Sequence, residues 1–241
     1  CGCTHLIIHL ADYYSKQIVT ATNDSTNYGL AKGGEDIWSA EHMKNLQKMA
    51  GRYGLCIYGI ENFSPADWYD ILLDGPGRQE QMEVLKQIIR NAGKAGIRSF
   101  GYNFSLAGVW GHQKHPHARG RAMSTCFDSS EIKYDAPIPK GQIWNMTYAA
   151  GDGTCLEPVS SLQLWDRLKR FLEEILPVAE EAGVEMALHP DDPPMDLLRG
   201  MPRLVFQPEL YQRVIDISPS KSNKLELCLG SIQEMTHGSV Y

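Results

Sequence analysis

The feature that most constrains the fold is a glycine that follows a helix-like segment and is itself followed at once by an apolar, strand-like run. Glycine readily adopts the left-handed conformation that ends a helix, so each such glycine predicts a helix stop before a strand. "KLELCLGS" (224–231) is a further strand candidate without this glycine. The pattern itself occurs in "CGCTHLIIHL" (1–10), "YGLCIYGIENF" (53–63), "AGIRSFGYNF" (95–104) and "AGVEMALHP" (182–190).

The segments before these glycines have the spacing of amphipathic helices. In residues 76–95 and 160–182, apolar side chains recur every three or four positions, which places them on one face of a helix. Ser160 or Ser161 is suited to cap the second of these helices. A short helix over about 208–216 is expected before the last strand candidate.

Alternating helices and apolar strands predict parallel β/α units rather than a half-exposed antiparallel sheet. No GxGxxG or GxxxxGK[ST] motif follows a strand candidate, which weakens an open nucleotide-binding sheet and favours a (β/α)₈ TIM barrel. About five of the eight β/α units can be counted, so we expect residues 1–241 to form a single, incomplete barrel domain. The chain also lacks an initiating Met and stops where a helix begins, as a fragment would.

One connection stands out by its length. Residues 105–159 contain no strong helical or strand pattern and are rich in Gly, His and Pro. Long connections in compact domains are usually functional, and in barrels the loops that follow the strands form the active face. We therefore expect this βα loop to cover the active site.

Composition excludes several classes of partner. The net charge of −6, without a run of Lys and Arg, argues against nucleic-acid binding. No stretch reaches the roughly 20 apolar residues that a membrane span requires, and no signal peptide is recognisable. The six cysteines have no CxxC pair or framework spacing, which indicates free thiols in a reducing compartment. The expected location is the cytoplasm.

A metal site is suggested at the ends of the last two strand candidates. His189 ends the run "MALHPDDPP", and Cys228 lies near the same end of the next strand. Neighbouring parallel strands are about 4.8 Å apart, so these two side chains could meet one ion. Imidazole and thiolate suit a divalent transition metal. Each residue also has an ordinary interpretation, since a strand cysteine is usually a buried apolar residue and a lone histidine is usually hydrogen-bonded.

Other strand ends carry polar residues that could face a ligand. Glu61 and Asn62 end the second strand candidate, and Tyr102 and Asn103 end the third. Capping and loop hydrogen bonds would explain these residues equally well. His9, near the end of the first strand candidate, is closer to the expected active face than His5, although the role of both is open.

The segment "GHQKHPHARGR" (111–121) concentrates positive charge in an otherwise acidic chain. Arg119 or Arg121 could bind a substrate carboxylate through two hydrogen bonds. A solvated basic loop would have the same composition.

Four stretches in this order resemble the metal-dependent mannonate dehydratases of hexuronate breakdown: "GIENFSPADWYDILLDGPGR", "RNAGKAGIRSFGYNFSLAGVWG", "ALHPDDPP" followed by "RGMPRL", and "LCLGS". The resemblance implies a (β/α)₈ barrel that removes water from D-mannonate to give 2-keto-3-deoxy-D-gluconate, with Mn²⁺ or Fe²⁺. The family's ligand histidine and cysteine fall on His189 and Cys228. Glu61, Asn103, Arg119 and Arg121 remain candidates for substrate contacts.

The resemblance also implies what this chain lacks. Its segments match family strands two to six, so a second His and an Asp ligand, and the acid and base residues, are expected elsewhere. The catalytic residues are therefore unknown, and the 241 residues alone are expected to be inactive. Unpaired edges of a partial barrel would favour a homo-oligomer. Two alternatives stay open: a metal-dependent sugar isomerase or epimerase on the same fold, and a non-catalytic sugar-acid-binding relative.

Overall fold

The computed structural model describes residues 2–10, 29–30, 36–131 and 133–241. Its centre is a five-stranded sheet of order β1-β3-β4-β9-β12, in which every neighbouring pair is parallel. Within the described residues the sheet is open, with β1 and β12 at its edges. The strands are β1 (His5–Ile8), β3 (Cys56–Glu61), β4 (Ser99–Tyr102), β9 (Glu185–Leu188) and β12 (Asn223–Leu225).

All five predicted strands are confirmed, and the last is shorter than predicted. It ends at Leu225. Cys228 is therefore not a strand residue and is instead the N-cap of a short helix. The helices are α1 (Ala40–Gly51), α2 (Pro65–Leu73), α3 (Arg78–Lys94), α4 (Ser161–Ala182), α5 (Leu210–Ile217) and α6 (Leu229–Glu234).

The helices predicted over 76–95, 160–182 and about 208–216 are confirmed as α3, α4 and α5. Ser160 caps α4 in a reciprocal capping box with Gln163, and Gly183 ends it with φ of 69°. Helix α2 was not predicted, although its buried residues Pro65, Trp68 and Leu72 have the spacing of one helical face. Its backbone departs from helical geometry at Trp68, a fully buried side chain.

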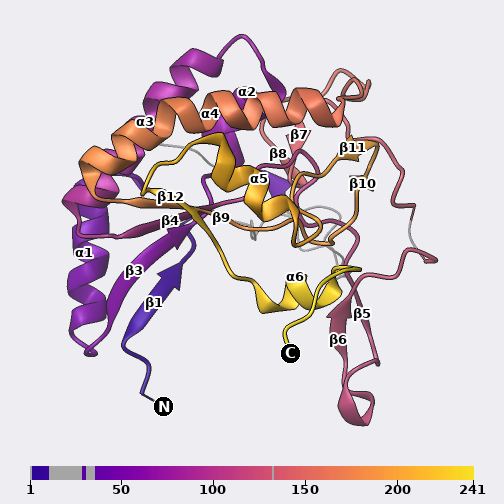
Figure 1. The fold of residues 1–241 in the computed structure, drawn as a ribbon, viewed down its shortest axis with the longest axis horizontal. Helices are drawn as coiled ribbons and strands as arrows, with labels where there is room; N and C mark the ends of the chain where they lie inside the picture. The colour runs from indigo at the N-terminus through magenta and orange to yellow at the C-terminus, as the bar shows by residue number, and fades with distance from the viewer. Residues whose placement is uncertain (1, 11–28, 31–35, 132) are drawn as a thin grey trace.

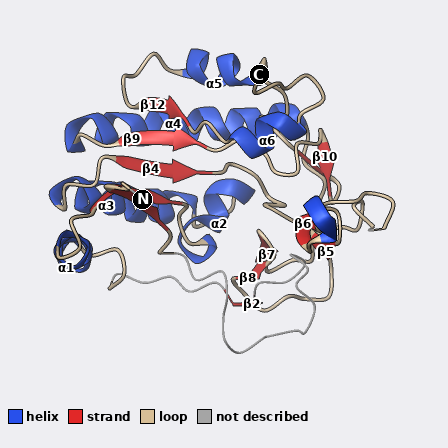
Figure 2. Ribbon diagram, turned by 90° about the horizontal axis from the view of Figure 1, so that it is seen from below, coloured by secondary structure: helices blue, strands red, loops and turns tan. Residues whose placement is uncertain are grey.

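The two faces of the sheet have different neighbours. Helices α1, α3 and α4 run along one face, as Figure 1 shows, and Figure 2 gives the same layers from below. Side chains alternate between the faces of a strand, so Phe100, Tyr102, Met186 and Leu188 enter the hydrophobic core that these helices complete. The opposite face carries the intervening residues and is free to hold polar groups.

The long connection between β4 and α4 contains short strands of its own. An antiparallel hairpin of β5 (Gln113–His115) and β6 (Ser124–Cys126) encloses the 3₁₀ turn η1 (Arg119–Arg121). Strands β7 (Gln142–Ile143) and β8 (Met146–Thr147) pair with each other, and β8 also pairs with β2 (Gly29–Leu30). A further hairpin, β10 (Leu197–Leu198) and β11 (Met201–Pro202), lies between β9 and α5.

In the described part of the chain no helix has both the length and the apolar character needed to cross a bilayer. The predicted free thiols are confirmed for Cys3, Cys56, Cys126, Cys155 and Cys228, and Cys1 lies outside the described residues.

Candidate metal centre

Strand register brings polar residues from separate strands to the same face at the carboxyl end of the sheet. Glu61 of β3 is paired with Gly101 of β4, and Gly101 is paired with Ala187 of β9. His189 comes two residues after Ala187, and Glu226 comes two residues after the β12 residue that pairs with Ala187. Because side chains alternate along a strand, these side chains share the face opposite the helices.

The three polar side chains on this face converge. One ligand atom from each of Glu61, His189 and Glu226 lies within 4.8 Å of the other two. His9, just past β1, brings its Nε2 to 3.2 Å from Oε2 of Glu61. We call Glu61, His189, Glu226 and Cys228 the inner cluster.

The structure brings together His189 and Cys228, which the sequence predicted to share an ion, closely enough for each to shift the pKa of the other. Nδ1 of His189 lies 2.6 Å from the carbonyl oxygen of Pro190, which leaves Nε2 as the nitrogen available to a ligand. The hydroxyl of Ser231 donates to the sulfur of Cys228 across 3.2 Å. Contacts with Pro190 and Ser231 thus fix the orientations of the His189 and Cys228 side chains.

The charges of the inner cluster favour a cation. Burial opposes the protonation of His189, but Cys228 and Glu226 outweigh it and raise its pKa to about 9. The adjacent imidazole of His189 lowers the pKa of Cys228 to about 7. Burial and the nearby charge of Glu61 raise the pKa of Glu226. Two carboxyl groups and a thiol of lowered pKa therefore lie close together in a partly buried place, and their negative charge favours the binding of a cation.

Asn103, a predicted substrate contact, borders the inner cluster. Its Nδ2 donates to the carbonyl oxygen of Pro190 across 3.2 Å. Its Oδ1 is buried and has no hydrogen-bond partner among the described residues. Tyr102 was expected on the same side, and this expectation is wrong. Its ring packs in the core, with its centroid 5.4 Å from that of the Phe171 ring, because consecutive strand residues face opposite sides of the sheet.

The "DDPP" segment serves mainly to hold a neighbouring loop. One oxygen of Asp191 accepts hydrogen bonds from the backbone amides of Leu204 and Val205, both across 2.8 Å. Its other oxygen lies 2.9 Å from Nε of Arg203, and these two side chains are 4% and 0% exposed. The carboxylate of Asp191 is therefore occupied by residues 203–205, whereas Asp192 lies 3.4 Å from Nε2 of His112.

Arg119 and Arg121 lie apart from the inner cluster. Both are exposed in the turn η1, at the tip of the β5–β6 hairpin, which extends away from the central sheet in Figure 1. The structure does not bring them to the strand ends, so their contact with a substrate stays a prediction.

Glu226 and Gly101 were missed by the sequence analysis. Glu226 alternates with Lys224 along "KLEL", and this alternation could have assigned it to the polar face of the last strand. A β-carbon at Gly101 would lie 2.9 Å from Oε2 of Glu226 and 3.1 Å from Cγ of Glu61. The glycine therefore makes room for the two carboxylates.

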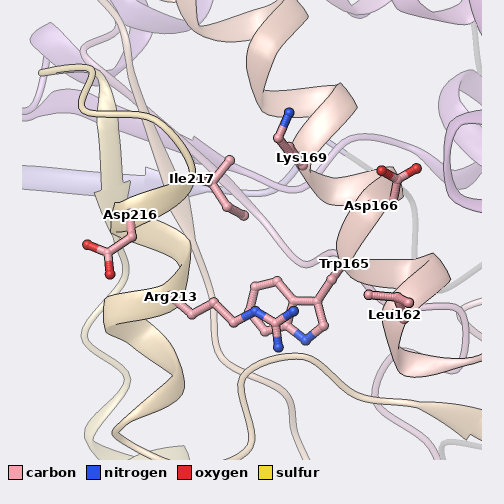
Figure 3. A pocket seen from close by; sticks show the side chains of 7 residues that line it. All are labelled: Leu162, Trp165, Asp166, Lys169, Arg213, Asp216 and Ile217. Atoms are coloured by element: carbon pink, nitrogen blue, oxygen red, sulfur yellow. The ribbon is translucent and has the colours of Figure 1, made fainter.

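A separate pocket of about 410 Å³ lies between α4 and α5, away from the inner cluster. Figure 3 shows the side chains that line it, with the guanidinium of Arg213 over the ring of Trp165 at 4.0 Å from the ring centroid. No inner-cluster residue lines it, so it is a groove of the outer helical layer.

Comparison with known proteins gives consistent matches. The model of the D-mannonate dehydratase (UxuA) family matches residues 15–240. The chain is 33% identical over 204 residues to a mannonate dehydratase of Streptococcus suis (strain 05ZYH33), covering 80% of this chain and 55% of that protein. It is 31% identical over 214 residues to a mannonate dehydratase of Geobacillus thermodenitrificans (strain NG80-2), covering 82% and 57%.

Among solved structures, the crystal structure of mannonate dehydratase from Streptococcus suis serotype2 matches with a TM-score of 0.68 and 27% identity. The match covers 95% of this chain and 64% of that one. The chain thus spans a little over half the length of the curated relatives it matches. Because the family match extends over most of the chain, this chain belongs to the D-mannonate dehydratase (UxuA) family.

Proposed function

We propose that the full-length protein is a mannonate dehydratase, which removes water from D-mannonate to give 2-keto-3-deoxy-D-gluconate. The observation that carries the proposal is the convergence of Glu61, His189 and Glu226 at the carboxyl ends of parallel strands in a chain of this family. We further propose that the five-stranded sheet is part of a (β/α)₈ barrel, in which active sites lie at this end of the strands.

The donors of the inner cluster fit the Mn²⁺ or Fe²⁺ that we propose as cofactor. Imidazole nitrogen and carboxylate oxygen are ligands of these ions, and thiolate suits Fe²⁺ better than Mg²⁺ or Ca²⁺. Donors bound to one ion at about 2.1 Å are roughly 3–4 Å apart, close to the 4.8 Å limit within which the atoms of Glu61, His189 and Glu226 lie. When bound, such an ion polarises substrate oxygens and offsets negative charge.

The reaction requires loss of the C2 proton and of the C3 hydroxyl as water, after which the enol becomes the 2-keto acid. His189 and Cys228 would hold the ion, with their geometry supported by Pro190 and Ser231. The unpartnered Oδ1 of Asn103 can accept a hydrogen bond from a substrate hydroxyl.

Glu61 has two proposed uses, as a metal ligand or as an acceptor for a substrate hydroxyl. His9 supports either by holding Oε2 of Glu61 across 3.2 Å, and this contact lowers the pKa of Glu61. Arg119 and Arg121 have no comparable support from their positions.

The test is incubation of the full-length protein with D-mannonate and Mn²⁺ or Fe²⁺, followed by a colour reaction for 2-keto-3-deoxy acids. Colour that depends on the added metal supports the dehydratase. Conversion to an isomeric sugar acid without colour would instead identify an epimerase, and metal-dependent binding of D-mannonate without conversion would identify a non-catalytic relative.

The ligand assignment is tested by Cys228→Ser, with Cys56→Ser as the matched control, because Cys56 is an exposed thiol at the start of β3. We expect Cys228→Ser to lose both bound metal and activity, while Cys56→Ser keeps both. Normal metal content in Cys228→Ser would contradict the assignment.

A further inference from the structure

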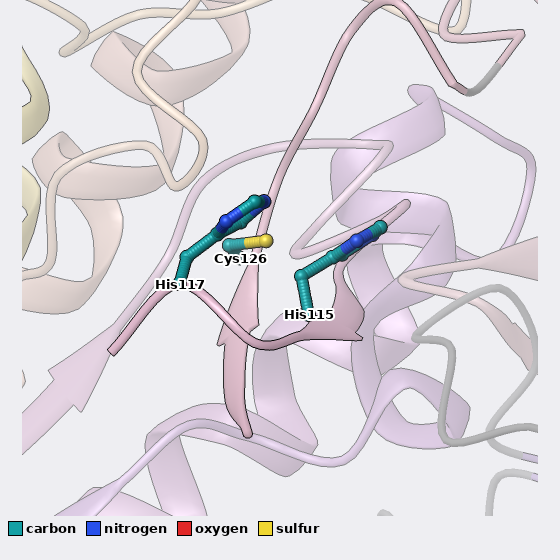
Figure 4. Close-up of side chains that lie close together, drawn as sticks. All are labelled: His115, His117 and Cys126. Atoms are coloured by element: carbon teal, nitrogen blue, oxygen red, sulfur yellow. The ribbon is translucent and has the colours of Figure 1, made fainter. Parts of the chain in front are cut away.

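A second group of metal-ligand side chains lies on the β5–β6 hairpin and shares no residue with the inner cluster. It comprises His115, His117 and Cys126, which Figure 4 shows facing one another. In the hairpin, Gln113 pairs with Cys126 and His115 pairs with Ser124, so His115 and Cys126 are diagonal neighbours on one face. The hairpin register therefore brings together His115 and Cys126, which ten residues separate in the sequence.

The geometry of this hairpin group suits a small coordination sphere. One ligand atom from each of His115, His117 and Cys126 lies within 4.8 Å of the other two. The two imidazole rings are nearly parallel, at 6°, with centroids 5.2 Å apart. Oε2 of Glu131 lies 3.2 Å from Nε2 of His115, close enough to serve as a fourth ligand or to orient that imidazole.

The surroundings of the hairpin group are acidic. Burial raises the pKa of the Cys126 thiol, and the negative charges of Asp128 and Glu131 raise it further. Hydrogen bonds with Ser130 lower the pKa of Asp128, and the nearby imidazoles of His115 and His117 lower it further. A cation at the group would therefore be stabilised by carboxylates already in place.

We propose that His115, His117 and Cys126 bind a divalent cation of the Zn²⁺ type, which links the two strands of the β5–β6 hairpin. Two imidazoles and a thiolate are the donors of tetrahedral zinc sites. An isolated two-stranded hairpin is only marginally stable in water, so a metal link would fix the part of the long connection that leaves the sheet.

The test uses Co²⁺ as a probe, because a thiolate bound to Co²⁺ produces a charge-transfer absorption. The full-length protein is prepared reduced and carries Cys228→Ser, so that the inner cluster cannot contribute a thiolate. We expect one equivalent of Co²⁺ to give the absorption and Zn²⁺ to displace it. Adding Cys126→Ser should abolish the absorption, and adding Cys155→Ser should leave it intact, since Cys155 is an exposed thiol outside the group.

An absent absorption in the Cys228→Ser protein, or one that survives Cys126→Ser, would overturn the proposal. A second measurement uses trypsin, which cuts after the exposed Arg119 and Arg121 within the hairpin. Zn²⁺ should slow these cuts at least several-fold in the Cys228→Ser protein and have no effect after His117→Ala. Equal cleavage rates with and without Zn²⁺ would also reject the link. Neither measurement depends on dehydratase activity.

Discussion

Gly101 faces the carboxylate of Glu226 so closely that a β-carbon on the glycine would lie 2.9 Å from Oε2. The same β-carbon would lie 3.1 Å from Cγ of Glu61. Atoms at these separations must move apart. Both carboxylates can therefore approach His189 only because Gly101 has no side chain.

Gly101→Ala should therefore displace Glu61 and Glu226 and weaken metal binding by roughly tenfold, as the loss of supporting groups around metal ligands commonly does. Calorimetric titration of the full-length protein with Mn²⁺ measures the change. Gly51→Ala is the matched control, because Gly51 ends α1 with no atom within 4 Å of an added β-carbon. Equal affinities in the two variants would show that the close approach has no role in binding.

Ser231→Ala should reduce metal affinity through Cys228. The hydroxyl of Ser231 donates to the sulfur across 3.2 Å and is 2% exposed, so alanine removes this support and little else. The expected loss is about tenfold, with partial recovery in Ser231→Thr, which restores a hydroxyl. Ser239→Ala, at an exposed serine beyond α6, should bind metal normally. A wild-type affinity in Ser231→Ala would remove Ser231 from this positioning role.

Asp191→Asn should destabilise the fold. The carboxylate is buried with Arg203 and accepts two backbone hydrogen bonds, and breaking a buried pair commonly costs about 3 kcal/mol. Urea unfolding gives the free energy. Asp166→Asn removes a carboxylate from an exposed pair with Arg170 in α4, where about 0.5 kcal/mol or less is expected. A loss of metal affinity in folded Asp191→Asn without loss of stability would contradict a structural role.

Chelation of the metal should lower the melting temperature of the full-length protein. A ligand present at 100 times its Kd stabilises the native state by about 2.7 kcal/mol, so added Mn²⁺ should raise the melting temperature by several degrees. His189→Ala should lose this response to Mn²⁺, whereas His237→Ala, at an exposed histidine, should keep it. Differential scanning calorimetry with and without EDTA makes the comparison, and an unchanged response in His189→Ala would exclude that residue as a ligand.

Much of the fold was determined locally. Glycine stops predicted four of the five strands of the sheet, and three-to-four spacing predicted helices α3 and α4, because helix ends and amphipathic faces depend on neighbours within a few residues. The proximity of His189 and Cys228 was also predictable, since adjacent parallel strands end at the same edge. Helix α2 was missed although its buried residues recur at three-to-four spacing, and its backbone departs from helical geometry at the buried Trp68.

The sequence by itself determined the β/α order and placed His189 and Cys228 just beyond the carboxyl ends of two adjacent strands. Only the tertiary structure decided that Glu226 joins them, that Tyr102 turns into the core, and that Asp191 is used by Arg203. The physical reason is that these relationships depend on strand register and on the path of long connections. A shift of one residue in register exchanges the two faces of a strand, and no local pattern specifies which distant side chain will be opposite.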